Sequence, residues 1–136
     1  MKTDSIQHID LSKLPSRVIA YRFIDELLEF LFPVEAGFGI EDDLTDERIE
    51  KLRRILREVI RPLKDKLPDS FEVIIHDFFE QLPEVYDKLI QDAHSFVKSD
   101  PAAESLEEVI VAYPGFYAIS VYRIAHVLYK MKVPIL

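Results

Sequence analysis

The feature that most constrains the fold is a repeat of apolar residues three or four positions apart, divided into segments by prolines. This spacing brings apolar side chains to one face of an α-helix. Its clearest example is the run Ile49, Leu52, Leu56, Val59 and Leu63. No stretch combines the apolar and polar alternation of a strand with a hairpin turn beside it. The sequence therefore predicts an all-α fold, a bundle of about six helices.

Prolines and capping side chains set the expected helix boundaries. In chain order, the helices are expected to begin at Pro15 or Ser16, at the cap Asp43 or Thr45, at the cap Asp69 or Ser70, after Pro83, at the cap Asp100, and near Phe116. Met1 to Leu14 is expected to be a polar arm that precedes the first helix. Pro33 is expected to end that helix, and Pro33 to Leu44 to form a loop. In this interpretation Asp100 caps the fifth helix, and Pro101 fills the first position, where an N–H is not needed.

The same periodicity assigns apolar faces to the first and last helices. The first face is expected to contain Val18, Tyr21/Arg22, Ile24/Asp25, Leu28 and Leu31/Phe32, and the last to contain Ile119, Tyr122/Arg123, His126 and Tyr129/Lys130. On the second helix, a solvated basic face is expected to pair with glutamates of the same helix. Its members are Lys51, Arg53, Arg54 and Arg57, with Glu47, Glu50 and Glu58 as partners.

Composition excludes several classes of function. The chain has 136 residues, enough for one domain with a buried core, and a formal net charge of −8. This acidity disfavours nucleic acids and anionic membranes as partners, because both are bound through basic patches. The chain has no cysteine, which excludes disulfides and thiolate metal sites and favours a cytoplasmic location. No apolar run approaches the roughly 20 residues of a membrane span.

A metal site is the first candidate for chemistry. His76 and Glu80 are four residues apart and share one helical face, and His94 is the available third ligand. Catalytic and structural zinc sites use three or four such ligands, and the helical zinc motif with two histidines is absent from this sequence. We therefore interpret His76 and Glu80 as a surface pair, and we assign no metal and no bound cofactor to the chain.

The last helix contains polar residues without a recognisable catalytic arrangement. A histidine base needs a nucleophile and an orienting carboxylate, and no serine lies in an elbow motif. We interpret His126 as a histidine that packs and hydrogen-bonds across helices, and Arg123 as a structural ion-pair partner. Core or interface positions are expected for Tyr113, Tyr117, Tyr122 and Tyr129. From the residues alone, the chain is an acidic helical domain without a catalytic centre.

Three short motifs follow one another toward the C-terminal end of the sequence. They are Asp100-Pro101-Ala102, Gly115-Phe116-Tyr117-Ala118 and Tyr122-Arg123-Ile124-Ala125-His126. In this order and spacing, the stretch from Asp100 to Leu128 resembles the end of the N-terminal helical domain of serine O-acetyltransferase. Tyr117 departs from the family pattern, in which many members have a histidine. The earlier helices are similar to the family only in kind, as acidic amphipathic helices.

The resemblance implies a role in making O-acetylserine for cysteine synthesis. The family joins this helical domain to a left-handed β-helix of hexapeptide repeats, which binds acetyl-CoA and supplies the catalytic histidine and its aspartate. That histidine activates the serine hydroxyl for attack on the thioester. Asp100 matches the aspartate that helps bind L-serine, for which cysteine competes as a feedback inhibitor. Asp100 is therefore the expected substrate-binding residue.

The resemblance also implies partners and a longer parent protein. In the family, the helical domain joins trimers into a hexameric homo-oligomer, and O-acetylserine sulfhydrylase binds the distant C-terminal tail. This sequence has no hexapeptide repeats. Residues 1–136 are therefore expected to be the N-terminal domain of a larger acetyltransferase and to be inactive alone. The alternative is a free-standing helical module for protein interaction or oligomerisation, without catalysis.

Overall fold

The structure, a computed structural model, describes residues 9, 12, 14–33 and 42–133. This part of the chain contains six α-helices and one 3-10 helix, and no strand. In chain order they are α1 (Arg17–Leu31), α2 (Asp42–Ile60), η2 (Arg61–Lys66), α3 (Phe71–Glu80), α4 (Leu82–Ser99), α5 (Leu106–Ala112) and α6 (Pro114–Lys130). The predicted all-α bundle is confirmed. Most of the predicted arm and of the loop after Pro33 lies outside the described residues.

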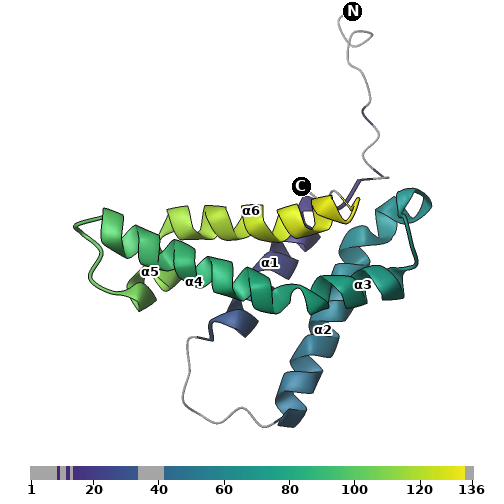
Figure 1. Cartoon of the computed structure of the whole chain (residues 1–136). Helices are drawn as coiled ribbons and strands as arrows, with labels where there is room; N and C mark the ends of the chain where they lie inside the picture. The colour runs from purple at the N-terminus through teal and green to yellow at the C-terminus, as the bar shows by residue number, and fades with distance from the viewer. Residues whose placement is uncertain (1–8, 10–11, 13, 34–41, 134–136) are drawn as a thin grey trace, which may run out of the picture.

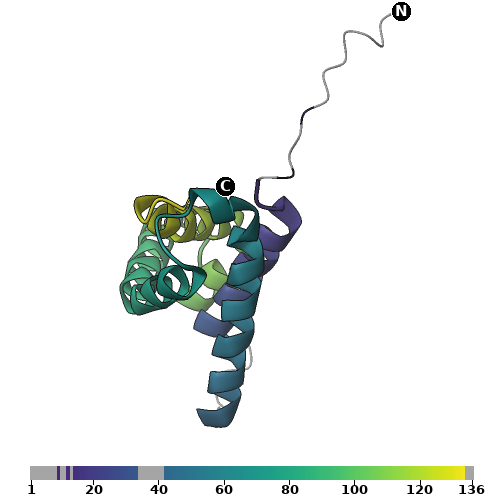
Figure 2. The ribbon, with the colours of Figure 1, turned by 90° about the vertical axis from the view of Figure 1, so that its right-hand side faces the viewer.

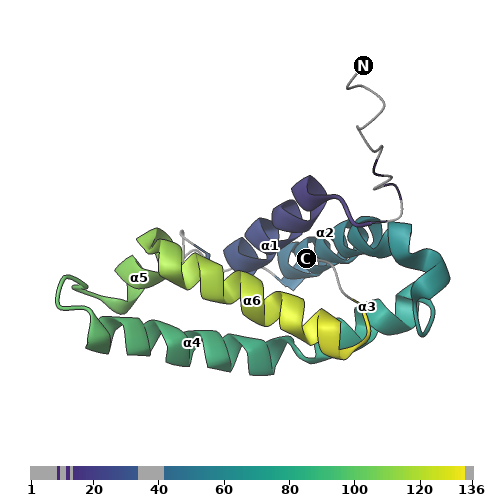
Figure 3. The same ribbon diagram turned by 90° about the horizontal axis from the view of Figure 1, so that it is seen from above.

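Two pairs of helices form the bundle. α4 and α6 lie side by side and run in opposite directions (Figures 1 and 3). α1 and α2 form the second pair, which crosses the first. A view from the side shows the two pairs as two layers (Figure 2). The short helix α5 lies at the end of the bundle where α4 finishes and α6 begins, so the α4–α6 connection makes a sharp corner there.

Aromatic rings at the centre of the core join the two layers. The ring centroids of Phe23 on α1 and Phe78 on α3 lie 5.6 Å apart. At the other end of α1, the centroid of Phe32 lies 5.2 Å from that of Tyr86 on α4 and 6.1 Å from that of Phe116 on α6. Phe23, Phe78 and Phe116 are at most 2% exposed. Such contacts contribute beyond the apolar area that they bury, and they hold α1 against both α4 and α6.

Capping explains where several helices begin. The side chain of Ser16 accepts a hydrogen bond from Ile19 N, and Ser70 accepts one from Val73 N, as predicted for the first and third helices. Pro83 lies in the first turn of α4, where its missing N–H has no consequence. The expected caps of the second helix are wrong, because α2 begins at Asp42 and already contains Asp43 and Thr45.

The second helix presents the predicted apolar face, the first helix presents it in part, and the last helix buries a different face. Leu52, Leu56, Val59 and Leu63 are buried as expected. On α1 the predicted Ile24 is buried, but the other buried residues are Ala20, Phe23 and Leu27, which were not predicted. On α6 the buried residues are Phe116, Ser120, Ile124 and Leu128. Val18 is 79% exposed. The charged members of the expected stripe, Arg22 and Asp25, are exposed, whereas the four buried residues of α1 are all apolar.

The basic face of α2 contacts neighbouring helices more than its own glutamates. Lys51 pairs with Glu26 of α1 at 3.3 Å, and Arg57 pairs with Glu72 of α3 at 2.8 Å. The guanidinium of Arg57 also lies over the ring of Phe71. The predicted pairing within the helix is therefore corrected, and these charges help to attach α1 and α3 to α2. None of the helices in the described ranges has the length and apolar composition needed to cross a bilayer.

Candidate functional site: the corner between α4 and α6

Asp100 ends one helix rather than beginning another. It is the C-cap residue of α4, with φ −108° and ψ 110°, and its N–H donates to Phe96 O. Its carboxylate Oδ1 accepts a hydrogen bond from Ala102 N at 2.9 Å, and its carbonyl accepts one from Ala103 N. A side chain that bonds the backbone two residues ahead is an Asx-turn. The predicted cap of the fifth helix is therefore wrong at Asp100.

Ser105, rather than the predicted Asp100, is the N-cap of α5. Its hydroxyl oxygen accepts a hydrogen bond from Glu108 N at 3.1 Å, and α5 begins at the next residue. Ser105 and Glu108 have the spacing of a capping box, and Glu107 adds a second acid to the first turn. This serine and glutamate pattern was the available signal. Because α5 begins only after Ser105, residues 100–104 lie between the two helices as a turn. In this turn the carboxylate of Asp100 is held by the hydrogen bond from Ala102 N.

Tyr113 lies at the junction of α5 and α6 and faces this turn. It is both the C-cap residue of α5 and the N-cap residue of α6. Its ring meets that of Phe96 edge-on, with 6.5 Å between centroids. The pKa of the Tyr113 hydroxyl is raised first by burial, then by the negative charge of Asp100, and further by the charges of Glu108 and Glu104. The phenol is thus protonated at neutral pH beside a group of carboxylates.

The close approach of α6 to α4 at this corner depends on Gly115. A Cβ at this position would lie 3.0 Å from Phe96 Cε1 and 3.1 Å from Phe96 Cζ. Both distances are tighter than ordinary van der Waals contact. The missing side chain therefore lets the first turn of α6 rest on the Phe96 ring, and this contact determines where Tyr113 lies relative to Asp100.

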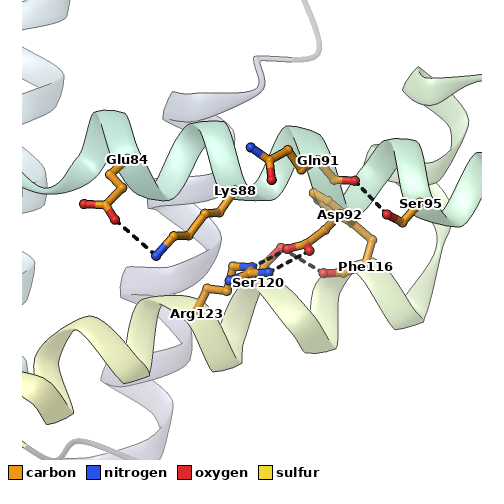
Figure 4. Close-up of polar contacts among 8 residues, drawn as sticks. All are labelled: Glu84, Lys88, Gln91, Asp92, Ser95, Phe116, Ser120 and Arg123. Atoms are coloured by element: carbon orange, nitrogen blue, oxygen red, sulfur yellow. Dashed lines mark hydrogen bonds and ion pairs between the residues drawn. The ribbon is translucent and has the colours of Figure 1, made fainter.

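An ion pair joins α4 to α6 next to the corner, as Figure 4 shows. Arg123 on α6 contacts both carboxylate oxygens of Asp92 on α4, with 2.8 Å between Nη2 and Oδ1. The two side chains are 28% and 13% exposed. The hydrogen bonds from Arg123 to Asp92 raise the pKa of Arg123, and burial opposes them. The interpretation of Arg123 as a structural ion-pair partner is confirmed.

The remaining predicted residues lie elsewhere on α6. The hydroxyl of Tyr117 donates to Asp25 Oδ1 at 2.7 Å and so ties α6 to α1. His126 is exposed and stacks between the rings of Tyr122 and Tyr129, with centroids 5.5 Å and 6.5 Å away. Tyr122 and Tyr129 are 61% and 65% exposed. Of the predicted core or interface positions, the core alternative is wrong for these two tyrosines, and the predicted hydrogen bond of His126 across helices is not observed.

The residues considered for a metal do not come together. His76 Nε2 lies 3.7 Å from Glu80 Oε1 on the exposed side of α3. These two residues therefore form the surface pair that the sequence predicted. His94 is an exposed residue of α4. Among the residues that the structure describes, no group of three or more histidine, aspartate or glutamate side chains could hold a metal ion.

The chemistry available at the corner is recognition rather than bond making. Asp100 is half-buried, and its carboxylate has acceptor capacity beyond the hydrogen bond from Ala102 N. Of the histidines in the described ranges, only His76 pairs with a carboxylate, far along the chain from Asp100. These features define a class: an acidic, all-helical domain with a fixed carboxylate at one corner.

Comparison with known proteins identifies the family. Residues 49–121 match the family described as serine acetyltransferase, N-terminal. The match covers more than half of the chain and includes Asp100, Tyr113 and Gly115. The chain therefore belongs to the serine acetyltransferase N-terminal family, and the resemblance noted from the sequence motifs is confirmed.

Individual relatives differ in how much of their length is matched. "Serine acetyltransferase, plasmid" of Synechococcus elongatus is 29% identical over 157 residues, which cover 98% of this chain and 49% of the relative. Serine acetyltransferase of Bacillus subtilis is 50% identical over 44 residues, 32% of this chain and 20% of that protein. DNA primase DnaG of Aeropyrum pernix is 30% identical over 105 residues, 75% of this chain and 25% of the primase. The chain thus spans about half the length of the first relative and less of the others.

Proposed function

We propose that this chain is the N-terminal helical domain of a serine O-acetyltransferase. The complete enzyme transfers the acetyl group of acetyl-CoA to the hydroxyl of L-serine and so makes O-acetylserine for cysteine biosynthesis. The family match and the names of the relatives support this activity. Acetyl-CoA and the catalytic base belong to the half of the relatives that this chain does not match. The helical domain contributes binding and assembly.

Asp100 binds the ammonium group of the substrate in this proposal. The observation that carries the assignment is the fixed, half-buried carboxylate at the end of α4, held by Ala102 N at 2.9 Å. An ionised carboxylate forms strong charge-assisted hydrogen bonds with an ammonium group, and Glu104 and Glu108 add negative potential nearby. Cysteine has the same ammonium and carboxylate groups as serine. It therefore competes for this place as a feedback inhibitor.

Assembly and location complete the proposal. The exposed rings of Tyr122 and Tyr129 on α6 support a role of this domain in a homo-oligomer, since aromatic residues are enriched at interfaces. The assembly has the trimeric or hexameric order of the family, and O-acetylserine sulfhydrylase binds a C-terminal tail beyond this chain. The absence of cysteine from the 136 residues supports a cytoplasmic location.

Consumption of acetyl-CoA with L-serine tests the proposed activity. The two proteins to compare are the 136-residue chain and the full-length protein that contains it. We expect serine-dependent turnover in the full-length protein and none in the chain alone. D-Serine is the matched control, because it has the same groups in the wrong arrangement. No turnover by the full-length protein would contradict the proposal and favour the helical interaction module.

A further inference from the structure

A groove lined by arginines lies between α2 and α3, away from the corner that contains Asp100. α3 and α5 are at opposite ends of the bundle (Figures 1 and 3). The groove has a volume of about 160 Å³, and its lining residues are Glu50, Arg53, Arg54, Arg57, Glu72 and Ile75. We call it the arginine groove. Its cations gather in one place on a chain whose formal net charge is −8.

Aromatic rings of α3 hold two of these guanidinium groups. The Cζ atom of Arg53 lies 5.4 Å from the centroid of the Phe79 ring, and that of Arg57 lies 5.3 Å from the centroid of the Phe71 ring. At such distances a guanidinium is attracted to the face of the ring. This attraction leaves its N–H donors able to bond an anion. Because the rings hold the groups in advance, binding an anion costs less side-chain entropy.

The carboxylates of the groove leave many of these donors unused. Glu72 Oε1 accepts a hydrogen bond from Arg57 Nη2 at 2.8 Å, and the side chain of Glu72 is 69% exposed. Among the residues that the structure describes, neither Arg53 nor Arg54 forms an ion pair with a carboxylate. The positive groups outnumber the carboxylates of Glu50 and Glu72. The groove therefore keeps a net positive charge and free donors for an oxyanion.

The size and charge of the groove favour a compact anion over a polymer. The arginines fall between residues 53 and 57, so they do not form the long basic stripe that a nucleic acid or an acidic chain would follow. The net charge of −8 also repels large polyanions. A phosphate group is compact, and its oxygens match the planar fork of a guanidinium.

We propose that the arginine groove binds a phosphate group, as inorganic phosphate or as the phosphate monoester of a small molecule. Arg53 and Arg54 supply most of the donors, and Arg57 supplies those that Glu72 does not use. The site is separate from Asp100, and the proposal does not depend on the proposed function.

The test is a titration of the isotope-labelled 136-residue chain with inorganic phosphate, followed by the NMR signals of the arginine side chains. Sodium chloride keeps the ionic strength constant, and a second titration uses glycerol phosphate as the monoester. The variants are Arg54→Gln, Arg53→Lys and Glu50→Gln. Arg61→Gln is the matched control, because Arg61 pairs with Glu58 outside the groove. Circular dichroism shows that each variant keeps its helices.

We expect saturable shifts of the groove arginines, with a Kd on the order of 1 mM. Arg54→Gln should weaken binding about tenfold, because it removes a charged donor. Arg53→Lys should weaken it about fivefold, since lysine keeps the charge but not the fork. Glu50→Gln should tighten binding about threefold by removing a negative charge, a gain that a damaged fold would not produce. Arg61→Gln should bind as the wild type does.

Three results would overturn the proposal. The first is a set of shifts that rise without saturation, and the second is equal affinity in Arg54→Gln and the control, since both indicate screening alone. The third is tighter binding of tetraglutamate than of either phosphate ligand, which would assign the groove to an acidic protein partner. Equal affinities for phosphate and glycerol phosphate support both ligand sources. Binding of inorganic phosphate alone supports the free ion.

Discussion

The carboxylate of Asp92 and the guanidinium of Arg123 join α4 to α6 through two contacts, one of which measures 2.8 Å between Oδ1 and Nη2. The pair lies two helical turns before Asp100, in the same pair of helices that forms the corner. Both side chains are largely buried. The position of the corner therefore depends on an ion pair that mutation can remove without changing the corner residues themselves.

Breaking this pair from one side should destabilise the domain. Arg123→Met leaves the largely buried carboxylate of Asp92 without its cation, at a cost of about 2–3 kcal/mol in the free energy of unfolding. The double change Asp92→Leu with Arg123→Met should cost less, because it removes both charges. Urea unfolding measures both, and Glu84→Ala, which breaks the exposed Lys88–Glu84 pair, is the control at about 0.5 kcal/mol or less. Equal losses in Arg123→Met and the control would contradict this account.

Tyr117 should make the stability fall at alkaline pH. Burial, then the hydrogen bond to Asp25 and its charge, raise the pKa of this hydroxyl from 10.0 to about 12. The folded state holds the proton more tightly than the unfolded chain. The stabilising contribution is therefore complete below the unfolded pKa of 10.0, and it is lost as the pH rises through the folded value of about 12.

The measurement is urea unfolding of the wild-type chain and of Tyr117→Phe between about pH 9 and pH 11.5. Phenylalanine keeps the ring and removes the titrating group. The wild-type advantage over Tyr117→Phe should shrink across this range. A constant difference between the two proteins would show that Tyr117 does not titrate differently on folding.

Ser105 should contribute to stability as a helix cap. Ser105→Ala removes the acceptor for Glu108 N and should lower the free energy of unfolding by about 1 kcal/mol. Ser95 is the matched control, because its hydroxyl only donates to Gln91 O within the exposed surface of α4. Ser95→Ala should change stability by less than about 0.5 kcal/mol. Chemical unfolding of the two variants gives the comparison, and equal effects would argue against the cap.

Lys132 should be a site of avoidable strain. Its φ of 67° is the left-handed conformation, in the Schellman motif that ends α6. The motif's two hydrogen bonds run from Lys132 N to Tyr129 O at 2.9 Å and from Val133 N to Leu128 O at 2.8 Å. Lys132→Gly should stabilise the domain by about 0.5–1 kcal/mol, since glycine adopts this conformation without steric cost. A lower melting temperature for this variant than for wild type would contradict that expectation.

The presence of the helices could be predicted from the sequence, because the patterns that indicate a helix are local. The repeat from Leu52 to Leu63, the cap at Ser70 and the restart at Pro83 are each decided within a few residues. The buried face of α6 was not predictable in the same way. Aromatic residues at Tyr122 and Tyr129 fit the helical period as well as the residues that are buried, and only the direction of α4 across α6 selects between the two faces.

The sequence predicts Asp100 as the candidate site residue, but it does not predict the local geometry around Asp100. Asp100 before Pro101 fits both a helix start and an Asx-turn, and the capping pattern of Ser105 and Glu108 decides between them. The electrostatic effect of Asp100 on Tyr113 links residues from two different helix junctions. It depends on how Gly115 rests on Phe96, which is a property of the folded corner.

The most direct test of the account is the kinetic effect of Asp100→Ala in the full-length enzyme. We predict a higher KM for L-serine and weaker inhibition by cysteine, with the acetyl-CoA KM unchanged. Because this variant also loses the hydrogen bond to Ala102 N, its thermal unfolding must be measured in the same preparation. Unchanged serine kinetics in a folded Asp100→Ala enzyme would contradict the central claim and leave Asp100 as a turn residue alone.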